Sequence, residues 1–244
     1  MVALVVVRTP QKLWDMLNAR PLDNSKVPKL LTMVTGDAKN LESVKELLSV
    51  RPKLIVFGVG GTPAFQLSIT TPVTLTDPHI CASAMMTLFD ALTATPELKS
   101  NPPPVAAIST TGISSTVKDV PFALRAMYKY TLHVPHVDKL EMENILTSKA
   151  YELGSQWILI KPSLLTDAPP TSVDAKCPTQ RPKTIKVGWE GGPDGPAVGY
   201  TISRDDVGKW LYESVVHPIA IQNTQQGVEK VECEWFGRKV SVTY

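Results

Sequence analysis

Short apolar runs alternate along this chain with segments in which apolar residues recur at helical spacing. The clearest example lies between Val134 and Leu153, where the spacing predicts an amphipathic helix. Gly154 then suits the left-handed cap that ends a helix. The continuously apolar run 157–160 follows, which is typical of a strand covered on both faces. A helix, a tight turn and a buried strand form half of a βαβ unit, so the pattern indicates a parallel sheet.

The same alternation predicts the other elements. Strands are expected at 3–7, 30–34, 54–57 and 105–108, and helices at 10–19, 41–48 and 80–93. After residue 167 the pattern changes, and we expect a proline-rich loop or lid at 168–182, short strands at 184–187 and 200–203, a helix at 205–217 capped by Ser203, and a terminal hairpin of 231–235 with 239–243. Residues 113–133 are expected to be irregular and partly helical.

These elements predict an α/β fold, a Rossmann-like, doubly wound and mostly parallel sheet. One domain of residues 1–244 is expected, because no shift in composition marks a second one. Its core sheet and helices fall within 1–167, and 168–244 form a small C-terminal substrate and lid region with a returning helix and the hairpin.

Composition narrows the classes of protein. The net charge of +2 is too small to argue for nucleic acid or an anionic membrane, and no apolar run is long enough to cross a bilayer. The three cysteines, Cys81, Cys177 and Cys233, include no CxxC pair, so we expect reduced thiols and a cytoplasmic protein. No metal site is expected, because no plausible ligand set accompanies the histidines.

Candidate chemistry gathers where three expected strands end. Gly36-Asp37, Gly58–Gly61 and Ser109–Gly112 each follow a strand, and open α/β sheets bind ligands at the carboxyl ends of their strands. Glycine and serine also form ordinary turns, so one such loop would carry little weight. Arg8 directly follows the first strand of the chain. In a dinucleotide-binding sheet, an arginine after the second strand accommodates the 2′-phosphate of NADP, whereas a lone arginine beside a turn is also consistent with a solvated side chain.

Several segments occur together in an order that resembles a known family. They are LVVVRTPQKL, TGDAKNLESVKELL, LIVFGVGG, VAAISTTG, VPHVDKLEMENIL with WILIKPSLLTD, and YTISRDDVGKWL. Together they are similar to atypical short-chain dehydrogenases of the NAD(P)H-binding type, such as the biliverdin-IXβ/flavin reductases and the NmrA-like proteins. The resemblance covers nearly the whole chain and is strongest from Pro135 to Asp167.

The resemblance implies an NADP(H) site and assigns residues to it. Arg8 corresponds to the contact with the adenosine 2′-phosphate, and Asp37 and Ala38 to the adenine side. Gly58, Val59 and Gly60 correspond to the border of the ribose and pyrophosphate. Ser109 and Thr110 fall beside the nicotinamide and substrate, and Pro162, Ser163 and Leu164 line the nicotinamide pocket. Asp206 corresponds to a structural position rather than a catalytic one.

The family's first strand and its glycine-rich GxxGxxG turn have no counterpart in this sequence, whose first glycine is Gly36. Two explanations are open. The chain is truncated and begins at the second strand, which leaves two inner strands without a neighbour, or the segment 1–7 has moved into the central position. We favour truncation, because LVVVRTPQKL matches the second-strand segment better. Either way, we expect NADP(H) binding to be weakened or lost.

The catalytic pair of short-chain dehydrogenases, a tyrosine four residues before a lysine, is also missing. Ser109 and Lys139 are the remaining catalytic candidates, although Lys139 and Glu143 could equally form a solvated helix pair. His133 and His136 could act as an acid or base, but with Pro135 between them they are expected to be ordinary loop histidines. Hydride chemistry belongs to the cofactor, so redox activity remains possible without the pair.

Three functions are consistent with these features. The first is an NAD(P)H-dependent oxidoreductase that acts on a small planar substrate. The second is a non-catalytic, NmrA-like protein that senses a dinucleotide and has a regulatory role. The third is a non-redox isomerase or cyclase of a biosynthetic pathway. All three involve a small molecule, with no nucleic acid and no membrane, and the sequence leaves the oligomeric state open.

Overall fold

The structure, a computed structural model, describes residues 3–19, 30–65, 73–114, 117–167, 184–222 and 232–244. Its strands are β1 (Ala3–Val7), β2 (Leu31–Thr35), β3 (Ile55–Phe57), β4 (Pro63–Phe65), β5 (Val73–Leu75), β6 (Val105–Ile108), β7 (Trp157–Pro162), β8 (Leu164–Thr166), β9 (Lys186–Trp189), β10 (Thr201–Ser203) and β11 (Arg238–Thr243). Its helices are α1 (Pro10–Asn18), α3 (Leu41–Leu48), α4 (Ile80–Ala94), α5 (Pro96–Ser100), α6 (Phe122–Thr131), α7 (His133–Leu153), α8 (Arg204–Leu211), the π-helical turn η1 (Tyr212–Val216) and α9 (His217–Gln222).

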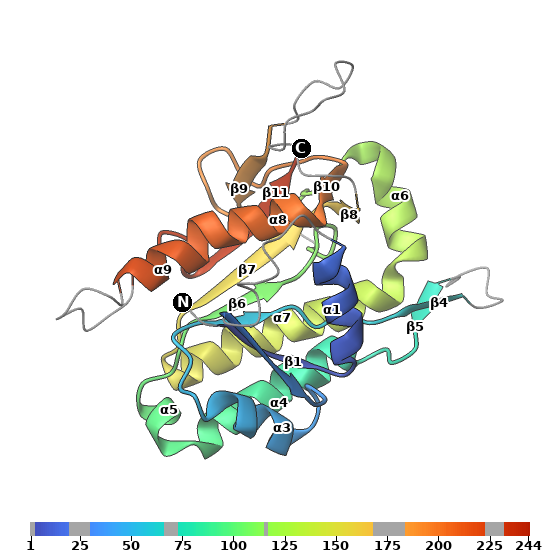
Figure 1. The fold of residues 1–244 in the computed structure, drawn as a ribbon. Helices are drawn as coiled ribbons and strands as arrows, with labels where there is room; N and C mark the ends of the chain where they lie inside the picture. Colours follow the sequence, from blue (N-terminus) through green and yellow to red (C-terminus); the bar gives the residue numbers. More distant parts are fainter. Residues whose placement is uncertain (1–2, 20–29, 66–72, 115–116, 168–183, 223–231) are drawn as a thin grey trace.

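A five-stranded sheet in the order β3-β6-β7-β11-β9 forms the centre of the molecule. The first four strands run parallel, and β9 pairs antiparallel with β11. Helices α4 and α7 lie on one side of this sheet and α8 and α9 on the other (Figure 1). Smaller two-stranded sheets join β1 with β2, β8 with β10, and β4 with β5. The doubly wound, mostly parallel α/β fold expected from the sequence is confirmed.

Strand β7 shows how the sequence produces two cores. Successive side chains of a strand point to opposite faces of its sheet. Leu159 accordingly packs among the residues of α4 and α7, whereas Ile158 and Ile160 pack among those of α8 and α9. All three side chains are fully buried, as the apolar run predicts.

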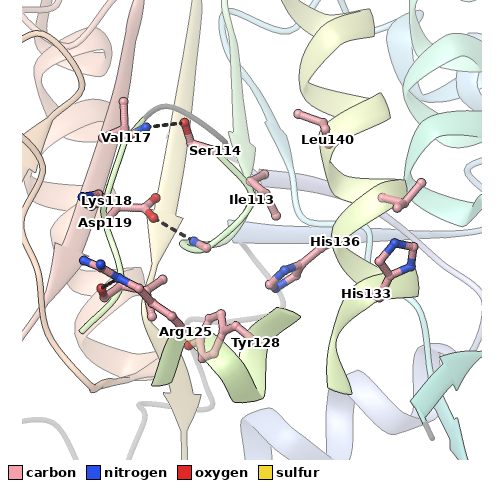
Figure 2. A pocket seen from close by; sticks show the side chains of 13 residues that line it. Ile113, Ser114, Val117, Lys118, Asp119, Arg125, Tyr128, His133, His136 and Leu140 are labelled. Atoms are coloured by element: carbon pink, nitrogen blue, oxygen red, sulfur yellow. Dashed lines mark hydrogen bonds between the residues drawn. The ribbon is translucent and has the colours of Figure 1, made fainter. Parts of the chain in front are cut away.

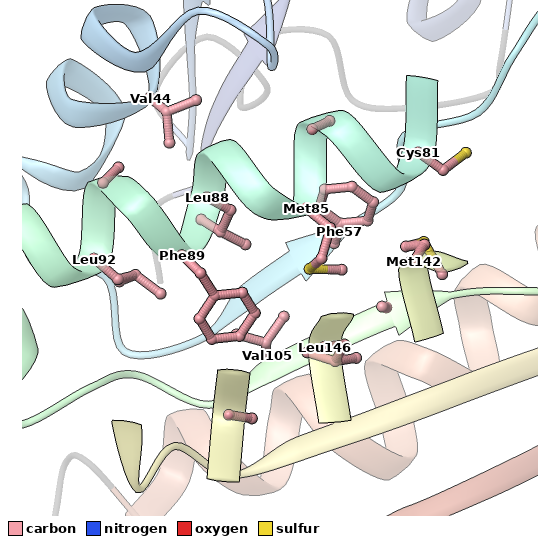
Figure 3. Packing of buried hydrophobic residues seen from close by; sticks show 14 of the residues in the cluster. Val44, Phe57, Cys81, Met85, Leu88, Phe89, Leu92, Val105, Met142 and Leu146 are labelled. Carbon is pink, nitrogen blue, oxygen red and sulfur yellow. The ribbon is translucent and has the colours of Figure 1, made fainter. Parts of the chain in front are cut away.

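Helix α4 is buried on nearly every side, which its mostly apolar sequence explains. In the first core, Met85 and Phe89 of α4 pack against Phe57 of β3 and Met142 and Leu146 of α7 (Figure 3). The second core lies across the sheet, where Trp210 of α8 packs with the inward residues of β7 and β11.

Helix α7 carries a charged residue on its buried stripe. Asp138 is completely buried, and its two carboxylate oxygens accept hydrogen bonds of 3.0 Å from the backbone N–H groups of Cys81 and Ala82. Those amides belong to the first turn of α4, where a helix has no internal acceptors for its N–H groups and favours a negative charge. Gly154 then ends α7 with φ of 71°, in the predicted left-handed cap.

Most predicted elements are present, with boundaries shifted by one or two residues. The side chain of Ser203 accepts a hydrogen bond from the backbone N–H of Asp206, as expected for the cap of α8. The terminal hairpin is wrong. Residues 234–237 form a turn, and β11 runs between β7 and β9 instead of pairing back on the segment before it. The predicted lid at 168–182 lies outside the described residues.

Among the strands that pair on one side only within the described part of the chain are β1 and β3. There β1 pairs only with β2, and β3 pairs only with β6. The hypothesis that the first segment has moved into the central position is therefore wrong, because β1 does not pair with β3. The open edges agree with the expectation of two inner strands without a neighbour. Val56, in the middle of β3, is 46% exposed although the strand belongs to the central sheet.

The open edge of β3 predicts rapid amide exchange at one position. The N–H of Ile55 donates to the carbonyl of Pro104 on the β6 side, so the next N–H, that of Val56, faces the open edge. We expect the Val56 amide to exchange roughly 100-fold faster than that of Ala106, which lies between two paired strands. Residue-resolved hydrogen exchange by NMR measures both rates. Equal protection of the two amides would contradict an open edge.

Candidate functional site

The carboxyl ends of β3, β6 and β7 lie side by side because these strands are neighbours and parallel. The backbone of Ser109 donates to the carbonyl of Ile160 at 2.7 Å, and that of Thr111 donates to Pro162 at 3.1 Å. The structure therefore places the loops after these strands at one edge of the sheet. This is the edge at which α/β sheets bind ligands.

Lys139 of α7 joins two of these strand ends. Its Nζ donates to the carbonyl of Val59 at 2.9 Å and to that of Ile108 at 2.8 Å. The third neighbour of the ammonium is the sulfur of Met142 at 3.9 Å, which is a weak acceptor. The solvated pair of Lys139 with Glu143 is therefore wrong, because each side chain binds other partners.

Glu143 is 1% exposed and binds on both sides of its carboxylate. One oxygen accepts a hydrogen bond of 2.6 Å from the hydroxyl of Ser109, and the other forms an ion pair of 3.2 Å with Lys239 of β11. A buried carboxylate needs such partners, since burying an unpaired charge is costly. The hydroxyl of Ser109, a catalytic candidate, is thus directed toward Glu143.

A second group of charges surrounds Lys161, at the carboxyl end of β7. This lysine is completely buried, and its Nζ lies 3.0 Å from Oδ2 of Asp119 and 2.5 Å from Oε1 of Glu190. Burial acts to lower the pKa of Lys161, but the nearby carboxylates outweigh it and raise the pKa above its ordinary value. Lys161 therefore holds its proton. This group could not be predicted from the sequence, because its members lie far apart along the chain.

A pocket of about 570 Å³ opens next to these strand ends (Figure 2). It lies between the loop after β6, helix α6 and the start of α7. Its lining residues are Gly112, Ile113, Ser114, Val117, Lys118, Asp119, Val120, Arg125, Tyr128, His133, His136, Val137 and Leu140. Such a volume is within the range of small-molecule sites, which hold about 300–1,000 Å³.

Gly112 shapes the floor of the pocket. Its φ of 86° is readily adopted only by glycine, and a Cβ there would lie 2.4 Å from the ring of Tyr128. The N–H of Gly112 donates to Oδ1 of Asp119 at 2.9 Å, which fixes this carboxylate at the pocket wall. Figure 2 shows the carboxylate of Asp119 and the ring of His136 pointing into the same space from opposite sides.

His133 and His136 belong to the first turn of α7, so their prediction as loop residues is wrong. Pro135 fits there because the first turn of a helix needs no backbone N–H from it. The ring of His136 lies 5.5 Å from that of Tyr128. Burial lowers the pKa of His136 to about 4, so its imidazole is neutral at pH 7. Burial also raises the pKa of Tyr128, which keeps its hydroxyl protonated.

The residues assigned to the adenosine side lie at the ends of β1 and β2 and of β3. Arg8 is exposed, Asp37 accepts the backbone N–H of Lys39 at 2.9 Å, and Ala38 packs against the first core. A hydrogen bond from Lys39 to Asp77 raises the pKa of Lys39, and the charge of nearby Arg8 opposes this shift. Lys39 is thus a second cation beside Arg8, which sequence reasoning did not identify.

The other assigned residues differ in how accessible they are. A Cβ on Gly58 or Gly60 would meet nothing within 4 Å, so the chain's own packing does not require glycine at either position. Pro162 and Ser163 are buried, and the hydroxyl of Ser163 is bonded to that of Thr243 at 2.8 Å. Leu164 is 46% exposed, and Thr110 is half-buried. These assignments remain predictions.

Comparison with known proteins places the chain in a family. It is 36% identical to the reductase pytE of Aspergillus terreus, over 98% of this chain and 87% of the relative. It is 32% identical to the oxidase pynE of Aspergillus niger, over 88% of this chain and 84% of the relative. The chain belongs to the family of these two proteins. No protein-family model matches it.

The fold of this family member is that of the short-chain dehydrogenase/reductases. A short-chain dehydrogenase/reductase of Veillonella parvula in complex with NADP matches all of the chain and 95% of its own length, with a TM-score of 0.56 at 14% identity. A second structure of such a protein from the same organism gives a TM-score of 0.54 at 13% identity. The narrower resemblance to biliverdin-IXβ reductases and NmrA-like proteins remains a prediction.

Two absences concern the described residues only. Among them, no group of three or more histidine, cysteine, aspartate or glutamate side chains is arranged to hold a metal ion. None of the helices in this part of the chain has both the length and the apolar character needed to cross a membrane.

The two hydrogen bonds by which Lys139 bridges the strand ends predict that the K139M variant is less stable. The substitution keeps the stem of the side chain but leaves the carbonyls of Val59 and Ile108 without their donor. We expect unfolding to require about 1–3 kcal/mol less free energy, measured by urea denaturation. K149M is the matched control, since Lys149 pairs with Glu152 on the surface, and it should change stability by less than about 0.5 kcal/mol. Equal effects would contradict the bridge.

The lowered pKa of His136 predicts that the folded protein loses stability in acid. Its pKa is about 4 in the folded protein and 6.5 as the ordinary value. Between these values the unfolded chain binds a proton that the folded chain excludes, so stability falls as the pH drops from 6.5 to 4. We expect H136Q to remove about 1–3 kcal/mol of that loss in urea unfolding measured at several pH values. H79Q changes an exposed histidine and should leave the pH dependence intact.

Proposed function

We propose that this chain is an NAD(P)H-dependent oxidoreductase that acts on a small planar molecule. The observation that carries the proposal is the position of the pocket. It opens directly after β6, beside the strand ends that Lys139 joins. The names of the two relatives, a reductase and an oxidase, support the same class of chemistry, because hydride transfer can run in either direction.

The adenosine end of the cofactor fits the residues after β1, β2 and β3. Gly58 and Gly60 leave open space beside their backbone, which a ribose or pyrophosphate would fill. Arg8 and Lys39 carry positive charges near each other, and a 2′-phosphate is attracted to such a pair. The charge of Lys39 is partly offset by its ion pair of 2.6 Å with Asp77. This favours NADP(H) over NAD(H).

The nicotinamide end fits the strand ends beside the pocket. Lys139 offers an ammonium whose weakest contact is a sulfur atom, so a ribose hydroxyl could replace that contact. Leu164 and Thr110 are the accessible members of the assigned nicotinamide wall. The bound cofactor would supply the hydride, and the chain would position the substrate against it and exclude water.

The pyrophosphate is the part of the cofactor for which this chain offers the fewest binding groups. The sequence lacks the glycine-rich turn that opens the first helix in dinucleotide-binding sheets, and the edges of β1 and β3 are open in the described part of the chain. We therefore propose that this chain binds NADP(H) weakly.

The proposed substrate is a small, flat molecule held between apolar and polar side chains. The rings of Tyr128 and His136 and the apolar side chains of Val137 and Leu140 offer surfaces for a planar ring. Asp119 provides one polar group in the same pocket.

Cofactor binding tests the proposal directly. Titration of the full chain with NADPH and with NADH, followed by tryptophan fluorescence, should show tighter binding of NADPH. In R8Q we expect NADPH to bind about tenfold more weakly while NADH binding is unchanged, because a phosphate contact is worth about 1.4 kcal/mol. The control R51Q changes an exposed arginine before the opposite end of β3 and should bind both cofactors as the wild type does.

Two results would overturn the proposal. One is the absence of any binding at millimolar cofactor. The other is equal loss of NADPH and NADH binding in R8Q, which would mean that Arg8 does not contact the 2′-phosphate. Oxidation of NADPH in the presence of menadione, a small planar quinone, would establish the oxidoreductase activity.

A further inference from the structure

Three charged side chains connect the pocket with the protein surface. Asp119 lies at the pocket wall with a 2% exposed side chain, Lys161 follows at 1%, and Glu190 ends the series at 17%. The distances are 3.0 Å from Oδ2 of Asp119 to Nζ and 2.5 Å from Nζ to Oε1 of Glu190. We call this series the Asp119–Lys161–Glu190 line.

Stability alone gives little reason for such a group. A buried ion pair loses the hydration of both charges, and apolar residues of similar size often stabilise a protein equally well. Buried titratable groups beside a cleft are instead typical of functional sites. Oδ2 of Asp119 is a further indication of a functional role. It is buried and lies within ion-pair distance of Lys161, yet it has no hydrogen bond among the described residues.

Reduction of a substrate by hydride requires a proton, and the other polar groups near the pocket are less suited to provide it. The hydroxyl of Tyr128 lines the pocket and is protonated, but burial raises its pKa, so it releases a proton less readily than an ordinary tyrosine. The position four residues before Lys139 is Pro135 rather than a tyrosine, and Lys139 itself donates to two carbonyls. The hydroxyl of Ser109 donates to Glu143. His136 is neutral at pH 7, since burial lowers its pKa to about 4.

We propose that Asp119 exchanges a proton with the substrate, and that Lys161 and Glu190 carry that proton from solvent. The inference rests on the proposed oxidoreductase function. A bound, reduced nicotinamide cofactor would supply a hydride to one atom of a substrate double bond. The π electron pair moves to the neighbouring heteroatom, which takes a proton through the carboxylate of Asp119 as Lys161 gives its own proton to Asp119.

Lys161 is then neutral, and its proton has to be replaced. Glu190 passes a proton from water to Lys161. The products are the substrate with two added hydrogen atoms and the oxidised cofactor, so atoms and charge balance. The reverse sequence serves an oxidation and releases one proton to solvent through Glu190.

Other charged groups around the Asp119–Lys161–Glu190 line determine when the proton moves. Glu143 of α7 faces Lys161 and adds to the attraction of Asp119 and Glu190. Lys239 compensates Glu143 from β11, while His136 and Tyr128 face Asp119 from the pocket side. Three carboxylates thus surround two ammonium groups. Lys161 keeps its proton until a stronger base, such as the reduced substrate, forms in the pocket.

The first test changes the outer end of the line, which is partly exposed and not part of the pocket. With NADPH and menadione, we expect kcat of E190Q to fall about tenfold, with a larger solvent isotope effect in D₂O and unchanged NADPH binding. E152Q is the matched control, since Glu152 pairs with Lys149 on the surface. A kcat and isotope effect equal to those of the wild type would contradict the relay.

The second test removes the inner charges together. D119N alone leaves Lys161 with one partner fewer, so the double variant D119N/K161M is used because it leaves no unpaired ammonium. We expect kcat to fall at least about 100-fold with NADPH binding unchanged, and circular dichroism confirms that the variant is folded. Activity within about threefold of the wild type would contradict the role of Asp119.

The third test does not depend on the cofactor. The planar probe 4-nitrophenol reports by its absorbance whether it is bound as phenol or phenolate. Beside the carboxylate of Asp119 we expect the phenol form, with the probe's apparent pKa raised by about one unit in the wild type and not in D119N/K161M. An equal pKa in both proteins, or no bound form at all, would overturn the contact. A protein that shows the shift but never oxidises NADPH would instead contradict the proposed oxidoreductase function.

Discussion

Helix α7 holds the carboxyl ends of β3 and β6 and the start of α4 together through three charged side chains, of which Asp138 and Glu143 are buried and Lys139 is partly buried. Asp138 binds the first amides of α4, Lys139 binds the carbonyls that end β3 and β6, and Glu143 binds Ser109 and Lys239. Each of these groups would be costly to bury alone, so each requires the partner it has. The helix can therefore occupy only a position that satisfies all three. That constraint fixes the loops that form the site.

Much of the fold could be predicted from the sequence because local pattern and burial agree. The run around Ile158 reads as a strand with two buried faces, and Gly154 marks the end of the helix before it. The prediction of a terminal hairpin was wrong for a physical reason. The apolar alternation of β11 shows that one of its faces is buried, but it does not show which strand pairs with it, and pairing with β7 depends on residues about 80 positions away.

The site was less predictable than the fold. Strand-end loops follow from topology, so the positions of Gly58 and Ser109 at one edge could be anticipated. The partners of Lys139 and Glu143 could not, because spacing within a helix gives only the local alternative of a surface pair. Lys161 at the end of an apolar run was the one signal of a buried charge. A lysine there requires carboxylates nearby, but their origin in the loop before α6 and after β9 is a tertiary property.

The unpaired edges of β1 and β3 have a consequence for the thermodynamics of ligand binding. Within the residues that the structure describes, the unit of β1, β2 and α1 is attached to the rest of the molecule mainly through α3, without a strand ladder to the central sheet. Such a unit can unfold in part as a separate cooperative segment while the cores around α4 and β7 stay intact. A nucleotide bound at Arg8 would have to suppress these openings, and part of its intrinsic affinity would be used to do so. Ordering of the β1–β2 unit and occupation of the proposed adenosine site would then be two aspects of one equilibrium.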